Sequence, residues 1–150
     1  LNGMEEIIIL TKTNAGQDFK PLGKVASGGE LSRISLALSV VTSKTELTPS
    51  VVFDEVDVGI SGSVAEIVGQ MLKKLSSRYQ IICVTHLAQV AAQGQDHMKV
   101  VKTQKNGSTF TQVASLSPKE RTDEVARILG GITISDKTRI AAEEMINSSS

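Results

Sequence analysis

The 150-residue sequence is poor in cysteine and histidine, with a single thiol at Cys83 and imidazoles at His86 and His97. One cysteine cannot form an intrachain disulfide, which fits a reducing compartment, and this set of side chains provides no zinc-ligand cluster. Cys83 lies in the apolar run 81–84, so we expect a buried, unreactive thiol. The sequence also lacks a Gly-x-Ser-x-Gly turn, so a serine-hydrolase mechanism has no support.

Net charge and long apolar runs are absent as well. Lys plus Arg and Asp plus Glu number 16 each, so no overall basic field attracts the chain to nucleic acid. Any contact with DNA must then be local, or be made by parts outside these residues. No apolar run approaches the ~20 residues of a membrane-spanning helix, and the first residues show no secretory signal pattern. We therefore expect no membrane partner.

The most informative stretch present is Val51–Asp57, in which three apolar residues precede the carboxylates Asp54, Glu55 and Asp57. The β-branched and aromatic residues predict a short strand buried on both faces. Carboxylates this close repel one another, and a cation would relieve the conflict. A hydrophobic strand that ends in Asp-Glu places Mg²⁺ and a base beside a nucleotide phosphate. A strand that runs into an acidic surface turn is the alternative.

A second informative stretch, Ser27–Arg33, opens a predicted helix that extends to about residue 44. Ser27 and Glu30 fit a capping box, whereas Gly28 and Gly29 each forfeit up to ~1 kcal/mol of helix propensity relative to Ala. Glycines there leave bare backbone N–H groups, which suit an anion. These residues alone leave two alternatives open, a helix cap without a ligand and a phosphate site. The helical spacing comes from Leu31, Ile34, Leu38 and Val41.

The remaining segments complete an α/β pattern. A strand, a helix and a strand between residues 51 and 85 predict a right-handed parallel crossover, and ligands bind beyond the carboxyl ends of such strands. Asp54, Glu55 and His86 should therefore meet at one edge, although His86 alone would more simply be structural. His97 is predicted to lie at the surface without a function. Further expected elements are a strand at 7–10, a core-facing helix at 64–75, a strand at 80–85, a short helix at 87–93, a hairpin of strands 98–104 and 108–116 around Asn106-Gly107, helices that begin at Ser117 and Ser135, and a frayed, disordered end at 148–150.

In this order the motifs resemble those of the ATP-binding-cassette ATPases. Ser27–Arg33 resembles the signature motif, Val51–Glu55 the Walker B strand, Asp57–Gly62 the loop that follows it (the D-loop), and His86 the switch histidine. Transporter ATPases usually have Asp-Glu-Pro, whereas Asp-Glu-Val-Asp is closer to the SMC-like ATPases. The amino-acid sequence of these motifs is similar to that of the RecN family, which are bacterial DNA double-strand-break repair ATPases. This similarity also covers residues 13–16 and 124–131.

The sequence departs from the family in one respect: it contains no Gly-x-x-x-x-Gly-Lys-Ser/Thr phosphate-binding loop. Its Gly23-Lys24 has Asp18 in place of the first glycine and is followed by Val25. In the family this loop lies in an N-terminal lobe, and a long coiled coil precedes the C-terminal lobe. The resemblance therefore implies that residues 1–150 are the C-terminal half of a P-loop, ABC-type ATPase head. The implied fold has parallel strands with flanking helices, then a β-hairpin and two helices.

The resemblance also implies a role for each motif residue. Asp54 would bind Mg²⁺, Glu55 would activate the attacking water, and His86 would contact the γ-phosphate. Asp57 would bridge a dimer interface. The signature residues Ser27, Gly28, Gly29 and Glu30 would bind ATP held by the opposite subunit. Implied partners are the N-terminal lobe, a second copy joined through ATP, and DNA ends or duplex, in the cytoplasm at the nucleoid. The lobe alone would be inactive. A non-catalytic interaction module with a cassette fold, or another SMC-like head, remains the alternative.

Overall fold

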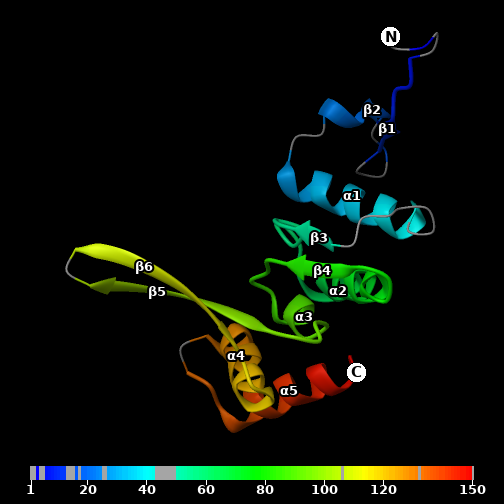
Figure 1. Ribbon diagram of the computed structural model, residues 1–150. Helices are drawn as coiled ribbons and strands as arrows, with labels where there is room; N and C mark the ends of the chain where they lie inside the picture. Colours follow the sequence, from blue (N-terminus) through cyan, green and yellow to red (C-terminus); the bar gives the residue numbers. More distant parts are fainter. Residues whose placement is uncertain are drawn as a thin grey trace.

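The computed structural model describes residues 3, 6–12, 16, 18–24, 27–42, 50–105, 107–131 and 133–149. Within these ranges the strands form three two-stranded sheets, and helices pack against one face of the central sheet (Figure 1). The elements in chain order are β1 (Leu10–Thr11), β2 (Lys20–Pro21), the 3₁₀ turn η1 (Leu22–Lys24), α1 (Gly28–Thr42), β3 (Ser50–Phe53), α2 (Gly62–Ser76), β4 (Gln80–Cys83), α3 (Ala88–Ala91), β5 (Met98–Lys105), β6 (Ser108–Ser115), α4 (Pro118–Gly130) and α5 (Asp136–Asn147).

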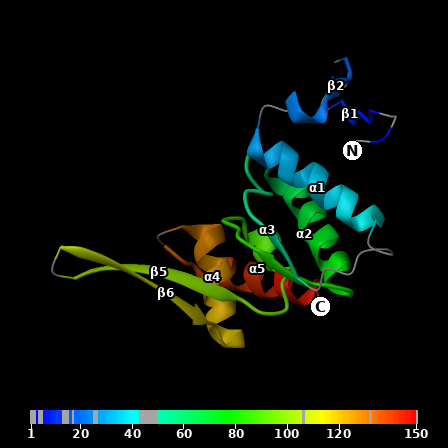
Figure 2. The same ribbon diagram turned by 45° about the horizontal axis from the view of Figure 1, so that its top comes forward.

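The central sheet pairs β3 with β4 in parallel, with Val51 opposite Ile81 and Phe53 opposite Cys83. This pairing confirms the predicted parallel arrangement, because α2 connects the two strands and returns the chain to the same end of the sheet. One face of the sheet packs on the main core, to which α1 contributes Leu36 and α2 contributes Val68, Leu72 and Leu75, among others. In Figure 2 the two helices lie next to each other beside the sheet.

The prediction that these strands are buried on both faces is wrong. Val52 of β3 is 64% exposed and Ile82 of β4 is 49% exposed, because α1 and α2 cover only the opposite face. Sheets with parallel strands usually have both faces covered. The apolar composition of β3 and β4 suits strands that are buried on both faces. The described residues cover only one of these faces.

Helices α1 and α2 confirm the predicted helical segments, but some of their apolar side chains face solvent instead of the core. The stripe expected to be buried on α2 includes Val64 and Ile67, which are exposed. On α1 the spacing singled out Leu31, Leu38 and Val41, which are exposed too, whereas Leu36 is fully buried. Each helix thus carries a second apolar face, and periodicity alone could not show which face meets the core.

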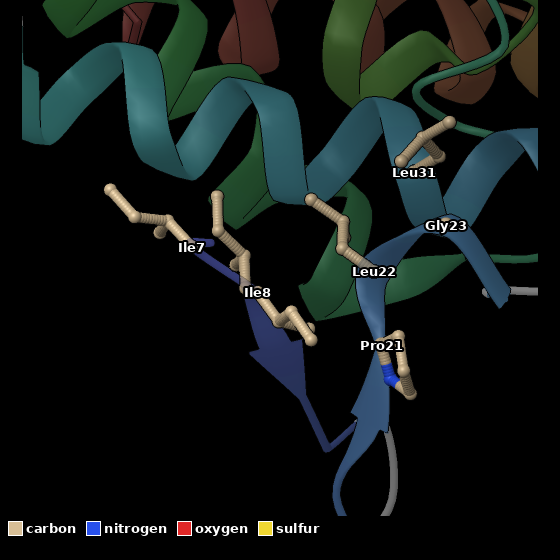
Figure 3. Close-up of a pocket in the computed structure, with 7 residues that line it drawn as sticks. Ile7, Ile8, Pro21, Leu22, Gly23 and Leu31 are labelled. Atoms are coloured by element: carbon tan, nitrogen blue, oxygen red, sulfur yellow. The ribbon is translucent and has the colours of Figure 1, made fainter. Parts of the chain in front are cut away.

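The strand predicted at residues 7–10 is reduced to Leu10–Thr11, which pair with β2 in antiparallel fashion. The exposed run Ile7–Ile9 before it has no regular secondary structure, and the Leu22 N–H donates to the Ile9 carbonyl at 2.8 Å. Together with α1, these segments surround an apolar pocket of about 500 Å³, shown in Figure 3. Of the turn that the sequence favours at residues 14–16, only Gly16 is among the described residues, and it lies in a turn with a φ of +87°. The pocket is lined by Ile7, Ile8, Ile9, Pro21, Leu22, Gly23 and Leu31.

The predicted hairpin is confirmed as β5–β6, with Met98 opposite Ser115 and Lys105 opposite Ser108. Gly107 adopts a φ of +76° in the turn, as two-residue hairpin turns require, and Asn106 lies outside the described residues. Nearly all hairpin side chains are exposed, and Figure 1 shows the hairpin projecting from the body.

The two predicted C-terminal helices are confirmed. A capping box between Ser117 and Glu120, with Pro118 at the first turn, begins α4. Helices α4 and α5 share a small core built on Val125, Ala126 and Ala142, together with Ala88 of α3. The fraying predicted for 148–150 stays a prediction: the Ser148 and Ser149 N–H groups continue helix-type bonding to the carbonyls of α5, and Ser150 is not among the described residues.

Candidate functional site

The carboxyl edge of the central sheet brings the predicted site residues together. Asp54 and Glu55 follow β3 directly, and His86 follows β4 after two residues. Because β3 and β4 are parallel and in register, both segments leave the sheet at the same end. The first turns of α1 reach this edge as well, since the Ser32 hydroxyl donates to the Asp54 carbonyl at 2.9 Å. The signature-like, Walker B-like and histidine segments therefore form one cluster.

Glu55 occupies a strained position in this cluster. Its φ is +58°, in the left-handed region that residues with a Cβ rarely adopt. Its N–H donates to Asp54 Oδ1 at 2.9 Å, which helps to hold the turn. Left-handed non-glycine residues concentrate at functional sites, where surrounding structure enforces them. The Glu55 carboxylate stays exposed and lies against the beginning of α1.

The glycine pair of α1 is explained in part by packing within the chain. A Cβ at Gly29 would lie 2.8 Å from the Val58 carbonyl oxygen, which is backbone, whereas a Cβ at Gly28 would meet only the end of the exposed Glu55 side chain, which can move aside. Ser27 caps the helix, because its hydroxyl accepts from the Glu30 N–H at 3.2 Å. Ser27 and Gly28 are exposed while Gly29 is buried. The close approach expected at these glycines is therefore made here by the loop after β3, with the helix start still open to solvent.

Arg33 joins α1 to the same loop, a contact that the sequence did not indicate. Its Nη1 donates to the Val58 carbonyl at 2.7 Å and to the Val56 carbonyl at 3.3 Å. An arginine in the second turn of a helix gives no sign in the sequence of where its guanidinium reaches. In the fold, this contact fixes the loop that carries Asp57 relative to the beginning of α1.

Asp57 lies beneath the loop and faces inward, with 2% of its side chain exposed. Its Oδ2 accepts from the Thr85 hydroxyl at 2.5 Å and from the His86 N–H at 3.0 Å, and it lies 3.2 Å from His86 Nδ1. The His86 side chain is otherwise 69% exposed. The role of Asp57 in bridging two subunits stays a prediction; within this chain its carboxylate is buried, and Val58 and Gly59 beside it are exposed. Thr85, which the sequence did not single out, completes the network.

The residues present fit the phosphate end of a magnesium nucleotide. Among the described residues, no group of three or more His, Cys, Asp or Glu side chains could hold a metal by itself. Mg²⁺ does not need such a cage, because it is usually held by one or two carboxylates together with phosphate oxygens and water. Asp54, exposed directly after β3, meets this requirement.

Two other predictions concern groups near or outside this edge. Burial, with the Asp57 and Asp54 carboxylates, raises the pKa of the Cys83 thiol to about 12, so the expected unreactive thiol stays protonated. His97 was predicted at the surface, but it is half-buried. Its Nδ1 is enclosed without a hydrogen-bond partner among the described residues. Burial lowers the pKa of His97, and the nearby Arg121 charge lowers it further.

None of the described helices is long and apolar enough to cross a bilayer.

Comparison with known proteins places these features in a family. The family model described as "RecF/RecN/SMC N terminal domain" matches residues 17–109, more than half of the chain. The DNA repair protein RecN of Vibrio cholerae is 49% identical over 144 residues, covering 96% of this chain and 26% of that protein. RecN of Bacillus subtilis is 41% identical over 144 residues, covering 96% and 25%. The chain thus spans about a quarter of the length of the curated relatives it matches.

A solved structure agrees with this assignment at the level of the fold. It comes from work on the structural biochemistry of ATP-driven dimerization and DNA stimulated activation of SMC ATPases. It matches with a TM-score of 0.54 and 24% identity, covering 79% of this chain and 71% of that chain. The expected α/β fold of an ABC/SMC-type ATPase head is therefore confirmed. The chain belongs to the RecF/RecN/SMC family, and the relatives it resembles here are RecN proteins.

Proposed function

We propose that this chain supplies the signature motif, the Walker B acid pair, the D-loop and the switch histidine of an ATPase that acts in DNA double-strand-break repair. The observation that supports the proposal most directly is the meeting of the α1 start, Asp54-Glu55 and His86 at one sheet edge. A binding module that lacked catalysis would have no need for this combination of an acid pair and an imidazole.

The role proposed for each side chain follows from its exposure to solvent. Asp54 would hold Mg²⁺, which supplies positive charge to the phosphates when bound. Glu55 would orient the attacking water and accept its proton. His86, whose imidazole is largely exposed, would donate to a γ-phosphate oxygen. Ser27, Gly28 and Gly29 would contact the γ-phosphate of ATP held by a second copy, with Glu30 next to them in the nucleotide-binding motif, because Ser27 and Gly28 at the beginning of α1 are open to solvent.

The partner lobe is part of the same proposal. The sequence has no phosphate-binding loop, and the chain spans about a quarter of its relatives' length. The described residues leave apolar surface open on the outer sheet face, on α1 and along Ile7–Ile9. An N-terminal lobe of the same protein, carrying the missing loop, would cover this surface. The complete protein would then dimerise through ATP and engage DNA in the cytoplasm, at the nucleoid.

Glu55→Gln in the longer protein tests the proposal. The amide keeps the size of the side chain but cannot accept a proton, so ATP turnover should fall by roughly 100-fold or more while ATP-bound dimers accumulate. Turnover is measured by phosphate release and dimerisation by light scattering. Glu66→Gln, an exposed position on α2, is the matched control and should behave as wild type. The 150-residue chain alone should show no turnover; robust hydrolysis by it, or an active Glu55→Gln protein, would refute the assignment.

A further inference from the structure

The Asp57 carboxylate connects the loop after β3 to the segment after β4 through a single oxygen. Oδ2 accepts from the Thr85 hydroxyl and the His86 N–H and lies 3.2 Å from His86 Nδ1. The carboxylate is buried, and the imidazole points from it into solvent. A buried carboxylate must have its lone pairs satisfied, and these donors supply the partners. The imidazole therefore has Nδ1 beside the carboxylate, while most of its side chain is exposed to solvent.

This geometry favours one protonation form of the neutral His86 ring. A carboxylate oxygen only accepts hydrogen bonds, so an oxygen 3.2 Å from Nδ1 favours a proton on Nδ1. In the neutral ring Nε2 then has a free lone pair. If Nε2 takes up a proton and donates to a phosphate, the anionic carboxylate compensates the positive charge of the ring.

We propose that Asp57 is a positioning residue that holds His86 in the Nδ1–H form and directs Nε2 toward the nucleotide. This inference rests on the proposed ATPase function for its catalytic consequence, but its tautomer statement does not depend on that function. It also changes the role of Asp57: this carboxylate acts through the histidine of its own subunit and not through a direct contact across the dimer.

The alternative is that Asp57 only pins the turn at Thr85. The Thr85 hydroxyl both donates to Asp57 and accepts from the Leu87 N–H at 3.1 Å, so Thr85→Val removes two contacts of the turn. It leaves the Asp57–His86 contact in place. Asp57→Asn keeps the shape of the side chain and so leaves the turn in place. It removes the negative charge that favours Nδ1–H. Comparing the two variants separates loss of the turn from loss of the tautomer.

The tautomer is read from the imidazole nitrogen chemical shifts of His86 in the chain described here, at a pH where the ring is neutral. Wild type and Thr85→Val should show Nδ1–H, and Asp57→Asn should show a shift of population toward Nε2–H. Asp57→Leu, which has no acceptor, should shift it further. Unchanged nitrogen shifts in folded Asp57→Leu would overturn the inference, whether or not the protein hydrolyses ATP.

In the longer protein, Asp57→Asn should lower kcat for ATP by about 10- to 100-fold, the usual cost of removing a group that orients a reacting side chain. The KM for ATP should change little, because Asp57 does not face the nucleotide. Thr85→Val should retain most of the kcat even if its Tm is lower. An equal loss of kcat in both variants would show that Asp57 only supports the turn. A wild-type protein without turnover would refute the proposed function while leaving the tautomer result standing.

Discussion

Individual residues at the sheet edge combine backbone strain with buried charge. Glu55 adopts a left-handed backbone, while Asp57, two residues later, is buried against His86. Arg33 holds the loop on both sides of Asp57 through the carbonyls of Val56 and Val58. The strain at Glu55 is thus maintained by contacts on both sides of it. This arrangement is expected where the position of a carboxylate matters more than its local stability.

Replacing Glu55 by glycine should therefore stabilise the chain. Glycine adopts positive φ without a steric penalty, so the free energy of unfolding should rise by about 1 kcal/mol. Glu55→Ala keeps the Cβ and should give no such gain, which makes it the matched control. Urea denaturation followed by circular dichroism measures both. Equal stabilities of the glycine and alanine variants would show that the backbone at Glu55 is not strained in solution.

At the scale of elements, one buried acid attaches the projecting hairpin to the helical end. Glu124 of α4 is 7% exposed and bonds to Lys99 of β5 and to Arg127 of its own helix. The hydrogen bonds from Arg127 are the largest cause that lowers the pKa of Glu124 to about 2, from a reference of 4.5. A carboxylate with a lowered pKa stabilises the fold when it is ionised.

The sign of the resulting pH dependence follows directly. The contribution of Glu124 is complete above its unfolded pKa of about 4.5 and is lost as the pH falls through its folded pKa of about 2. Glu124→Gln should therefore lower the free energy of unfolding by about 3 kcal/mol near neutral pH. This difference from wild type should shrink steadily below pH 4.5. Denaturant titrations at a series of pH values measure it, with exposed Glu143→Gln as control; a difference independent of pH would contradict the cluster's role.

Elements proved more predictable from the sequence than the direction in which their side chains face. The parallel strands, the Ser117 capping box and the hairpin follow from local patterns that few other structures satisfy. The core face of α1 cannot be predicted in this way, because apolar residues occur all around the helix. Its buried apolar residue is Leu36, which lies outside the predicted helical stripe. Likewise, a carboxylate that follows a strand can point outward or inward. The inward position of Asp57 depends on Thr85 and His86, which are distant in sequence.

The molecule as a whole leaves an unusual amount of apolar surface open. Val52 and Ile82 lie on the uncovered face of the central sheet, and Val84, just beyond β4, is 57% exposed. A parallel sheet of two strands with one bare face is far from the usual buried arrangement. The Vibrio cholerae relative, of which this chain spans 26%, has further polypeptide that could cover such a face in that protein.

Threonine at Val52 and Ile82 tests whether that face is covered in the longer protein. Threonine keeps the β-branched shape, so in the 150-residue chain the double variant should bind less of an apolar dye and self-associate less. Its free energy of unfolding should stay within about 0.5 kcal/mol of wild type, as for other exposed positions. In the longer protein the same pair should cost roughly 1.5–3 kcal/mol per side chain, because there the side chains would be buried. Val51→Thr, on the covered face of β3, should instead weaken both forms. Equal effects of the double variant in the short and long forms would mean that no partner lobe packs on this sheet.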